Sequence, residues 1–256
     1  MRTRFAIALV CLAMTADVLV APSAASQLSV LISGGFSAAY REVLPTFERT
    51  SGIDVTTTSG GSIGSGPNTI PGQLRRGVEA DVIILAREGM RDLMAEHLVL
   101  EGTDVDLARS VIGLVVRAGA PKPDISTVDN LKKVLVDARS VAVSSSTSGV
   151  YLTTTLFPKL GIGEQMAAKT SMAGAALVGR GEADVGLQQV SELLPIAGTQ
   201  FVGRIPDEVQ YVTTYAAAIG ARSENRDNAR SLIAFLSSDG VAEAIRRSGM
   251  EPVARP

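Results

Sequence analysis

Three short segments of the sequence combine glycine with hydroxyl side chains, and each lies where a strand-like apolar run gives way to a helical pattern. They cover residues 33–35, 59–66 and 144–149. Small residues at the start of a helix leave backbone N–H groups accessible, and these groups carry about half a positive charge. Hydroxyl groups add further hydrogen-bond donors. We therefore expect the segments to bind a small anion, with candidate contacts that include Gly34, Ser146 and Gly149.

Glycine and serine are also ordinary turn and cap residues, so one such segment taken alone indicates only a turn. Three segments at equivalent positions favour a binding role. The segment 59–66 lacks the lysine that ends a phosphate-cradling GxxxxGK loop, and Pro67 interrupts a dinucleotide-type glycine pattern. Nucleotide binding is therefore disfavoured.

Arg87 directly follows an apolar, strand-like run. At the end of a buried strand, its guanidinium could hold a carboxylate through two parallel hydrogen bonds. The same side chain could instead pair with Glu88 or Asp92 at the surface. Arg117 follows a later apolar run and offers the same chemistry.

Side chains suited to catalysis are few. His97 is the only histidine, and Cys11, the only cysteine, lies in the N-terminal segment. A thiolate mechanism, a zinc site and a bound cofactor are therefore not expected. The serine-rich segment also lacks the Gly-x-Ser-x-Gly pattern of a serine hydrolase. Acid–base chemistry would rest on Tyr151, an aspartate or a glutamate.

Residues 1–25 have the pattern of a secretory signal peptide, with Arg2 and Arg4, an apolar run over 5–20 and small residues at the end. Asp17 interrupts the run, and a retained N-terminal anchor is the alternative. No later run approaches the ~20 apolar residues of a membrane span. We expect an exported, periplasmic protein. Its formal net charge of −2 offers no cationic surface for nucleic acid.

The 256-residue chain alternates strand-like and helical patterns, which predicts an α/β fold. Strands are expected over 28–33, 54–58, 80–85, 111–116, 141–143, 184–189 and 209–219, and helices over 34–50, 70–77, 89–96, 150–160 and, as a pair, 228–247. Ligands of open α/β sheets collect at the carboxyl ends of the strands. We therefore expect the three glycine and hydroxyl segments to meet.

Four stretches, at residues 30–36, 77–84, 148–151 and 179–186, together resemble the periplasmic molybdate-binding proteins and their type II solute-binding relatives. The resemblance implies a two-lobed type II fold, each lobe a mostly parallel sheet flanked by helices. It implies a discontinuous first lobe, made of residues 26–110 and 212–256, and a second lobe made of residues 111–211. Two crossing strands, over 111–117 and 211–219, would join the lobes. It also implies a monomer that delivers its ligand to a membrane ABC permease.

Carried over by position, the resemblance implies an anion pocket built from Ser33, Gly35, Gly61, Ser62, Ser148, Gln189 and a residue near Met172 or Ala173. The chain departs from the family at Gly35, where the molybdate-binding proteins have serine, and at Gln189, where they have tyrosine. It also carries an insertion over 63–70 and the charged Arg87, whereas the family holds its anion with neutral groups. These departures favour an organic carboxylate over a metal oxyanion.

The function we expect is capture of a small anion, an organic carboxylate or a molybdate-like oxyanion, in a cleft between the lobes for ABC-type uptake. An enzyme that interconverts cis- and trans-aconitate also resembles this family, so an isomerase of that type is the alternative. Its allylic proton shift needs a base beside the anion pocket, and Tyr151 is the candidate. The sequence leaves the choice between binding protein and enzyme open.

Overall fold

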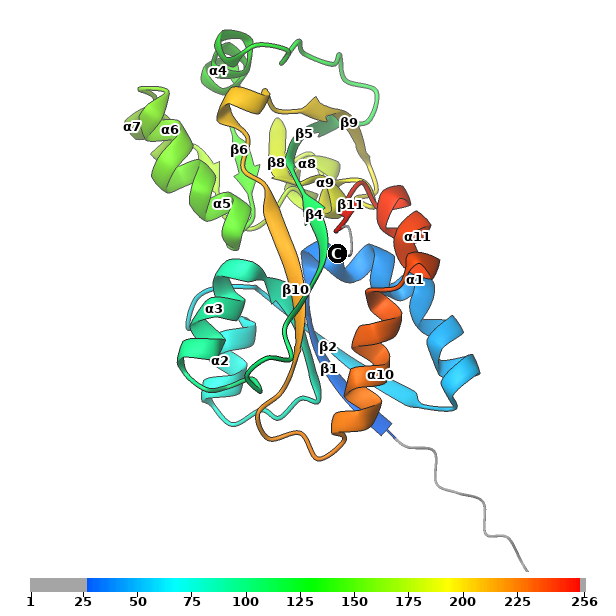
Figure 1. The fold of residues 1–256 in the computed structure, drawn as a ribbon. Coiled ribbons are helices and arrows are strands. Elements are labelled where there is room, and N and C mark those ends of the chain that lie inside the picture. The colour runs from blue at the N-terminus through cyan, green and yellow to red at the C-terminus, as the bar shows by residue number, and fades with distance from the viewer. Residues whose placement is uncertain (1–26, 254–256) are drawn as a thin grey trace, which may run out of the picture.

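The computed structural model describes residues 27–253, so the expected signal segment 1–25 lies outside the described residues. The described chain forms two sheets covered by helices (Figure 1). The first sheet has the order β11 (Glu251–Pro252), β4 (Val105–Ser110), β10 (Thr213–Ile219), β3 (Val82–Ala86), β1 (Gln27–Ser33) and β2 (Asp54–Gly60). The second has the order β7 (Thr170–Ser171), β6 (Val141–Val143), β8 (Val185–Gln189), β5 (Ile112–Arg117) and β9 (Thr199–Arg204).

Helices lie on both faces of each sheet. On the first sheet, one face packs α1 (Gly34–Ser51), α10 (Arg226–Leu236) and α11 (Ala242–Arg247), and the other packs α2 (Ile70–Arg75) and α3 (Arg87–Ala95). On the second, one face packs α4 (Val128–Asp137), α5 (Thr147–Tyr151), the π-helical turn Leu152–Leu156, α6 (Phe157–Lys159) and α7 (Gly163–Ala167), and the other packs α8 (Ala176–Gly179) and α9 (Val190–Leu193). Short 3-10 turns span Asp207–Val209 and Asp239–Val241.

Apolar runs form the inner strands because these strands are buried on both faces. In β1, Val30 and Ile32 join the core beneath α1, whereas Leu31 between them joins the core beneath α2 and α3. Side chains alternate in the same way in β3. Continuous apolar runs, rather than alternating ones, therefore predicted these strands correctly.

Each sheet is mixed, which corrects the expectation of mostly parallel sheets. β1 pairs in parallel with β2 and β3, and β6 pairs in parallel with β7 and β8. The strands that continue between the sheets run antiparallel to their neighbours: β10 to β3 and β4, and β5 to β8 and β9. A chain that crosses from one sheet to the other and later returns enters each sheet against the direction of the inner strands.

The chain passes between the sheets twice, from β4 into β5 and again before β10 (Figure 1). The expected strand 209–219 begins at Thr213, after the turn that ends at Val209. The lobe boundaries at 111 and 211 stay a prediction. Among residues 27–253, no helix has the length and apolar content to span a bilayer.

Candidate functional site

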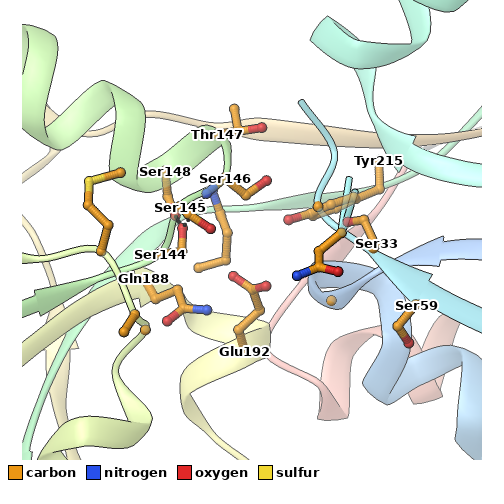
Figure 2. A pocket seen from close by; sticks show the side chains of 18 residues that line it. Ser33, Ser59, Ser144, Ser145, Ser146, Thr147, Ser148, Gln188, Glu192 and Tyr215 are labelled. Carbon is orange, nitrogen blue, oxygen red and sulfur yellow. Dashed lines mark hydrogen bonds between the residues drawn. The ribbon is translucent and has the colours of Figure 1, made fainter. Parts of the chain in front are cut away.

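A cavity of about 420 Å³ lies between the two sheets, at the carboxyl ends of their parallel strands (Figure 2). Its lining comprises residues 33–34, 59–61, 68, 144–148, 172–174, 188–189, 192 and 215. These residues follow or end β1, β2, β6, β7 and β8, with Tyr215 added from β10. Parts of all three glycine and hydroxyl segments therefore meet in one place, as the strand order predicts.

Six of the eleven residues expected at the site line this cavity, and five do not. Those in the lining are Ser33, Gly34, Gly61, Ser146, Ser148 and Gln189, and those outside it are Gly35, Ser62, Arg87, Gly149 and Tyr151. The residues outside the lining fall into two groups. Some support the cavity wall, and others are engaged elsewhere.

Gly35, Ser62 and Gly149 lie directly behind the cavity wall. The Ser62 backbone N–H donates to Ser146 Oγ at 3.2 Å and so links the two sides of the cavity. Its hydroxyl accepts from the Ala86 backbone N–H at 3.0 Å. A Cβ atom at Gly149 would lie 1.6 Å from the Ser144 carbonyl oxygen, so only glycine allows this turn. These residues shape the site without lining it.

Arg87 is engaged away from the cavity, contrary to the expected ligand contact. Its Nη1 donates to Asp104 Oδ2 at 2.6 Å and its Nε donates to Asp106 Oδ1 at 2.8 Å. Desolvation by burial opposes the charged form, but these hydrogen bonds leave the pKa of the guanidinium raised. The alternative from the sequence, a surface pair with Glu88 or Asp92, named other partners than Asp104 and Asp106, because β4 was not predicted.

Tyr151 is also directed away from the cavity, contrary to its expected place beside the ligand. Its hydroxyl donates to the Val209 carbonyl oxygen at 2.9 Å, and its ring stacks on Tyr211 with 4.8 Å between the ring centroids. The side chain therefore anchors the returning chain segment to the helix that begins at Thr147. It is not part of the cavity lining.

Glu192 is the titratable carboxyl of the cavity, and the sequence reading missed it. Burial at the start of α9 raises its pKa to about 7, although a hydrogen bond from Gln188 acts in the opposite direction. Gln188 is oriented for this contact, because its Oε1 accepts from the Ala175 backbone N–H at 3.0 Å. The signal was present in the sequence, since Gln188 and Gln189 end an apolar strand and Glu192 follows three residues later.

Tyr215 is the second titratable side chain that the sequence reading missed. Its ring is buried in the first sheet, and its hydroxyl points into the cavity (Figure 2). Burial raises the pKa of this hydroxyl well above its ordinary value, and the negative charges of Glu192 and Glu88 raise it further. The hydroxyl therefore keeps its proton and can act as a hydrogen-bond donor.

The glycine pair at the start of α1 makes room for these two side chains. A Cβ atom at Gly34 would lie 2.6 Å from Glu192 Oε1, and one at Gly35 would lie 1.8 Å from the Tyr215 hydroxyl oxygen. The pair was predicted as an anion-binding turn. It also allows a carboxyl and a phenol from distant parts of the chain to approach the helix start.

The remaining lining is neutral and includes polar atoms without a partner. Gln189 Nε2 donates to Thr213 Oγ1 at 2.6 Å, and its Oε1 is buried with no hydrogen bond in the described part of the chain. The buried Thr147 Oγ1 is unpartnered within residues 27–253 as well. None of the described lining residues is lysine or arginine. Over the same range, no three His, Cys, Asp or Glu side chains gather to hold a metal ion.

The model of the bacterial extracellular solute-binding protein family matches residues 28–251. The chain belongs to this family. Among its relatives, the chain is 40% identical to the aconitate isomerase of Pseudomonas sp. over 251 residues, which cover 96% of each chain. It is 25% identical over 235 residues to the molybdate-binding protein ModA of Mycobacterium tuberculosis, covering 88% of this chain and 84% of the relative.

The chain shares its fold with solved structures of periplasmic binding proteins. The periplasmic molybdate-binding protein of Azotobacter vinelandii superimposes with a TM-score of 0.68 at 18% identity, over 90% of this chain and all of that one. The two-lobed type II fold implied by the resemblance is thereby confirmed. The family in question is the molybdate-binding-like one, and it includes the aconitate isomerase.

Proposed function

We propose that this protein is an exported isomerase that interconverts cis- and trans-aconitate in the cavity between its two sheets. The observation that carries the proposal is Glu192, a half-buried carboxyl of the cavity lining whose pKa of about 7 suits proton transfer near neutral pH. It lies in a cavity whose other lining groups are neutral. The aconitate isomerase of Pseudomonas sp., 40% identical over nearly the whole chain, supports the same reaction.

The isomerisation moves one proton and one double bond across three carbon atoms. Glu192 takes a proton from the methylene carbon, and the electron pair of that C–H bond forms a double bond to the central carbon. The pair of the former double bond takes a proton from Glu192 at the opposite carbon. Atoms and charge balance, and nothing is oxidised or reduced. A single carboxyl suffices when both carbons face it.

The neutral lining explains how one pocket can hold anions and still keep a base. The hydroxyl and N–H groups at 33–34 and 144–148 offer hydrogen bonds to the carboxylates, where charge builds up during proton transfer. A lysine or arginine beside Glu192 would favour its ionised form and lower its pKa. The engagement of Arg87 with Asp104 and Asp106 keeps that cation away from the base.

The second candidate is passive capture of a small anion, carboxylate or molybdate-like, by a periplasmic monomer that serves an ABC permease. The family description and the molybdate-binding relatives favour it. In this reading the same loops hold the ligand, with Ser33, Gly34, Gly61, Ser146, Ser148 and Gln189 as contacts. Glu192 would then have no chemical task, which is why we rank this function second.

Incubation of the purified protein with trans-aconitate, with NMR detection of the cis isomer, separates the two functions. We expect many turnovers per molecule, and a loss of about a hundredfold or more in kcat for Glu192→Gln, as for removal of a general base. Glu164→Gln, at an exposed position on α7, is the matched control and should keep full activity. Conversion no faster than in buffer would reject the isomerase and leave the binding protein.

A further inference from the structure

Tyr215 links the crossing strand β10 to the cavity. The residue is only 3% exposed, and its ring belongs to the core of the first sheet together with Phe36 and Ala108. The end of the side chain passes the start of α1 at Gly35 and reaches the cavity lining (Figure 2). The position of its hydroxyl is therefore set by packing on all sides of the ring.

This hydroxyl has no partner of its own. Within residues 27–253 neither a hydrogen bond to it nor one from it is present. The hydroxyl is not among the fully buried polar atoms that lack a partner, and Tyr215 lines the cavity, so the hydroxyl is accessible from the cavity. A group of this kind that borders a cavity is suited to bind a ligand atom.

The groups around Tyr215 determine which kind of ligand atom it can bind. Glu192 and Glu88 face it with negative charge, and both oppose loss of its proton. The hydroxyl is thus a donor and needs an acceptor oxygen. Glu192 is the acceptor of protons in the same cavity, so the two side chains offer a substrate complementary contacts.

Gly35 makes this arrangement possible. A Cβ atom at that position would lie 1.8 Å from the hydroxyl oxygen of Tyr215 and 2.1 Å from its Cζ. Any side chain at position 35 would therefore displace the phenol. The glycine and the tyrosine form a pair in which the small residue lets the large one reach the cavity.

We propose that the Tyr215 hydroxyl is a catalytic residue that donates a hydrogen bond to a terminal carboxylate of bound aconitate. It stabilises the negative charge that this carboxylate gains while Glu192 holds the transferred proton, and Tyr215 keeps its own proton throughout. This role rests on the proposed isomerase function. It assigns to one phenol the part that oxyanion-binding donors play in other enzymes.

The test compares Tyr215→Phe with Tyr40→Phe. Tyr40 is a buried tyrosine of the same lobe whose hydroxyl is bonded to Thr57 Oγ1, outside the cavity. We expect Tyr215→Phe to lower kcat for trans-aconitate by about a hundredfold, as for loss of one oxyanion-binding donor. Its unfolding temperature should equal or exceed that of the wild type, since the lost hydroxyl has no protein partner. Tyr40→Phe should keep full activity.

Other outcomes distinguish this proposal from the function on which it rests. Suppose that the wild type isomerises trans-aconitate. If Tyr215→Phe then matches Tyr40→Phe in kcat and kcat/KM, or if Tyr215→Phe unfolds, the role of Tyr215 is refuted while the isomerase function stands. If the wild type does not turn over, affinity for the saturated analogue tricarballylate decides. Weaker binding of tricarballylate by Tyr215→Phe than by Tyr40→Phe supports Tyr215 as a hydrogen-bond donor to the ligand. Equal affinities of the two variants, or no binding of tricarballylate by the wild type, overturn that role.

Discussion

Glu192 illustrates how a carboxyl withdrawn from water can oppose the stability of its own fold. The carboxyl has an ordinary pKa of 4.5, and burial raises it to about 7. Between these values the folded protein binds a proton that the unfolded chain has released. The free energy of unfolding therefore falls as pH rises through this window and levels off above about pH 7.

Replacing Glu192 with Gln should remove this loss of stability. Relative to wild type, we expect no gain at about pH 4.5 and a gain of up to about 3 kcal/mol in unfolding free energy at about pH 8, since each pKa unit corresponds to about 1.4 kcal/mol. Urea denaturation at both pH values measures the difference. Glu164→Gln should show no gain that depends on pH. An equal gain at the two pH values would mean that the carboxyl titrates normally.

Arg87 shows why residue type alone is a weak guide to a site. A guanidinium at the end of a buried strand was predicted to hold a carboxylate, and it does so, but the carboxylates are Asp104 and Asp106 of the protein itself. The prediction of the chemistry was sound and the assignment of the partner was wrong. The partner is set by strand β4, whose mixed sequence gave no clear strand pattern.

At the scale of the elements, strand–helix junctions build the site. Ser33 ends β1 in an extended conformation and α1 begins at Gly34, so backbone N–H groups face the cavity at once. Similar junctions follow β2, β6 and β8. The sequence predicted three of these four from glycine and hydroxyl residues. It missed the β8–α9 junction because Gln189-Val190-Ser191-Glu192 contains no glycine.

Glycine at position 35 is required by the tertiary structure, whereas glycine at position 66 is not. Gly35→Ala should lower the free energy of unfolding by about 1–3 kcal/mol, as overpacking does, and should abolish isomerisation because the phenol of Tyr215 is displaced. Gly66→Ala, with no atom within 4 Å of the added Cβ, is the matched control and should behave as wild type. Thermal unfolding and the aconitate assay measure both effects. Similar behaviour of the two variants would contradict the close approach.

Periodicity did not find the edge strands β7, β9 and β11 or the inner strand β4, although it found the edge strand β2. β9 is only partly buried along its length, so its residues do not form an apolar run. β4 is buried at Leu107, Ala108 and Ser110 and exposed at Asp106 and Arg109, again without a regular period. The inner strands that are buried on both faces carry the strong signal. Sequence patterns therefore located the strands with a continuous apolar run better than those with a mixed sequence.

At the scale of the whole molecule, the site exists only where the two sheets meet. The hydrogen bond from the Ser62 N–H to Ser146 Oγ joins the two sides of the cavity. A second contact joins the Tyr211 hydroxyl to Glu88 on α3. Glu192 lines the cavity between these sides, so an ionised Glu192 would repel an anionic ligand there.

Binding and turnover should therefore depend on pH in opposite directions. As Glu192 ionises between about pH 6 and pH 8, calorimetry should show the affinity for the inert trianion tricarballylate falling by about fivefold or more, which corresponds to ~1 kcal/mol of added repulsion. Over the same interval kcat/KM should rise, because the free base is the active form. Tyr215, which faces Glu192, stays protonated throughout.

Glu192→Gln serves as the reference for this experiment, because it removes the titrating group and reports any change that comes from the ligand itself. Its affinity for tricarballylate should be nearly independent of pH. A wild type whose affinity follows that of the variant at every pH would show that the carboxyl does not face the ligand.

The sequence alone determined the local architecture: the strands buried on both faces, the helices that follow them, and the small residues where one gives way to the other. These features depend on side-chain periodicity and backbone sterics over a few neighbouring residues, which the order of amino acids specifies directly. Only the tertiary structure decided that Glu192 and Tyr215 meet at Gly34 and Gly35, and that Arg87 does not. Those contacts join residues far apart in the chain, and they arise from the way in which two sheets pack against each other, which no local spacing encodes.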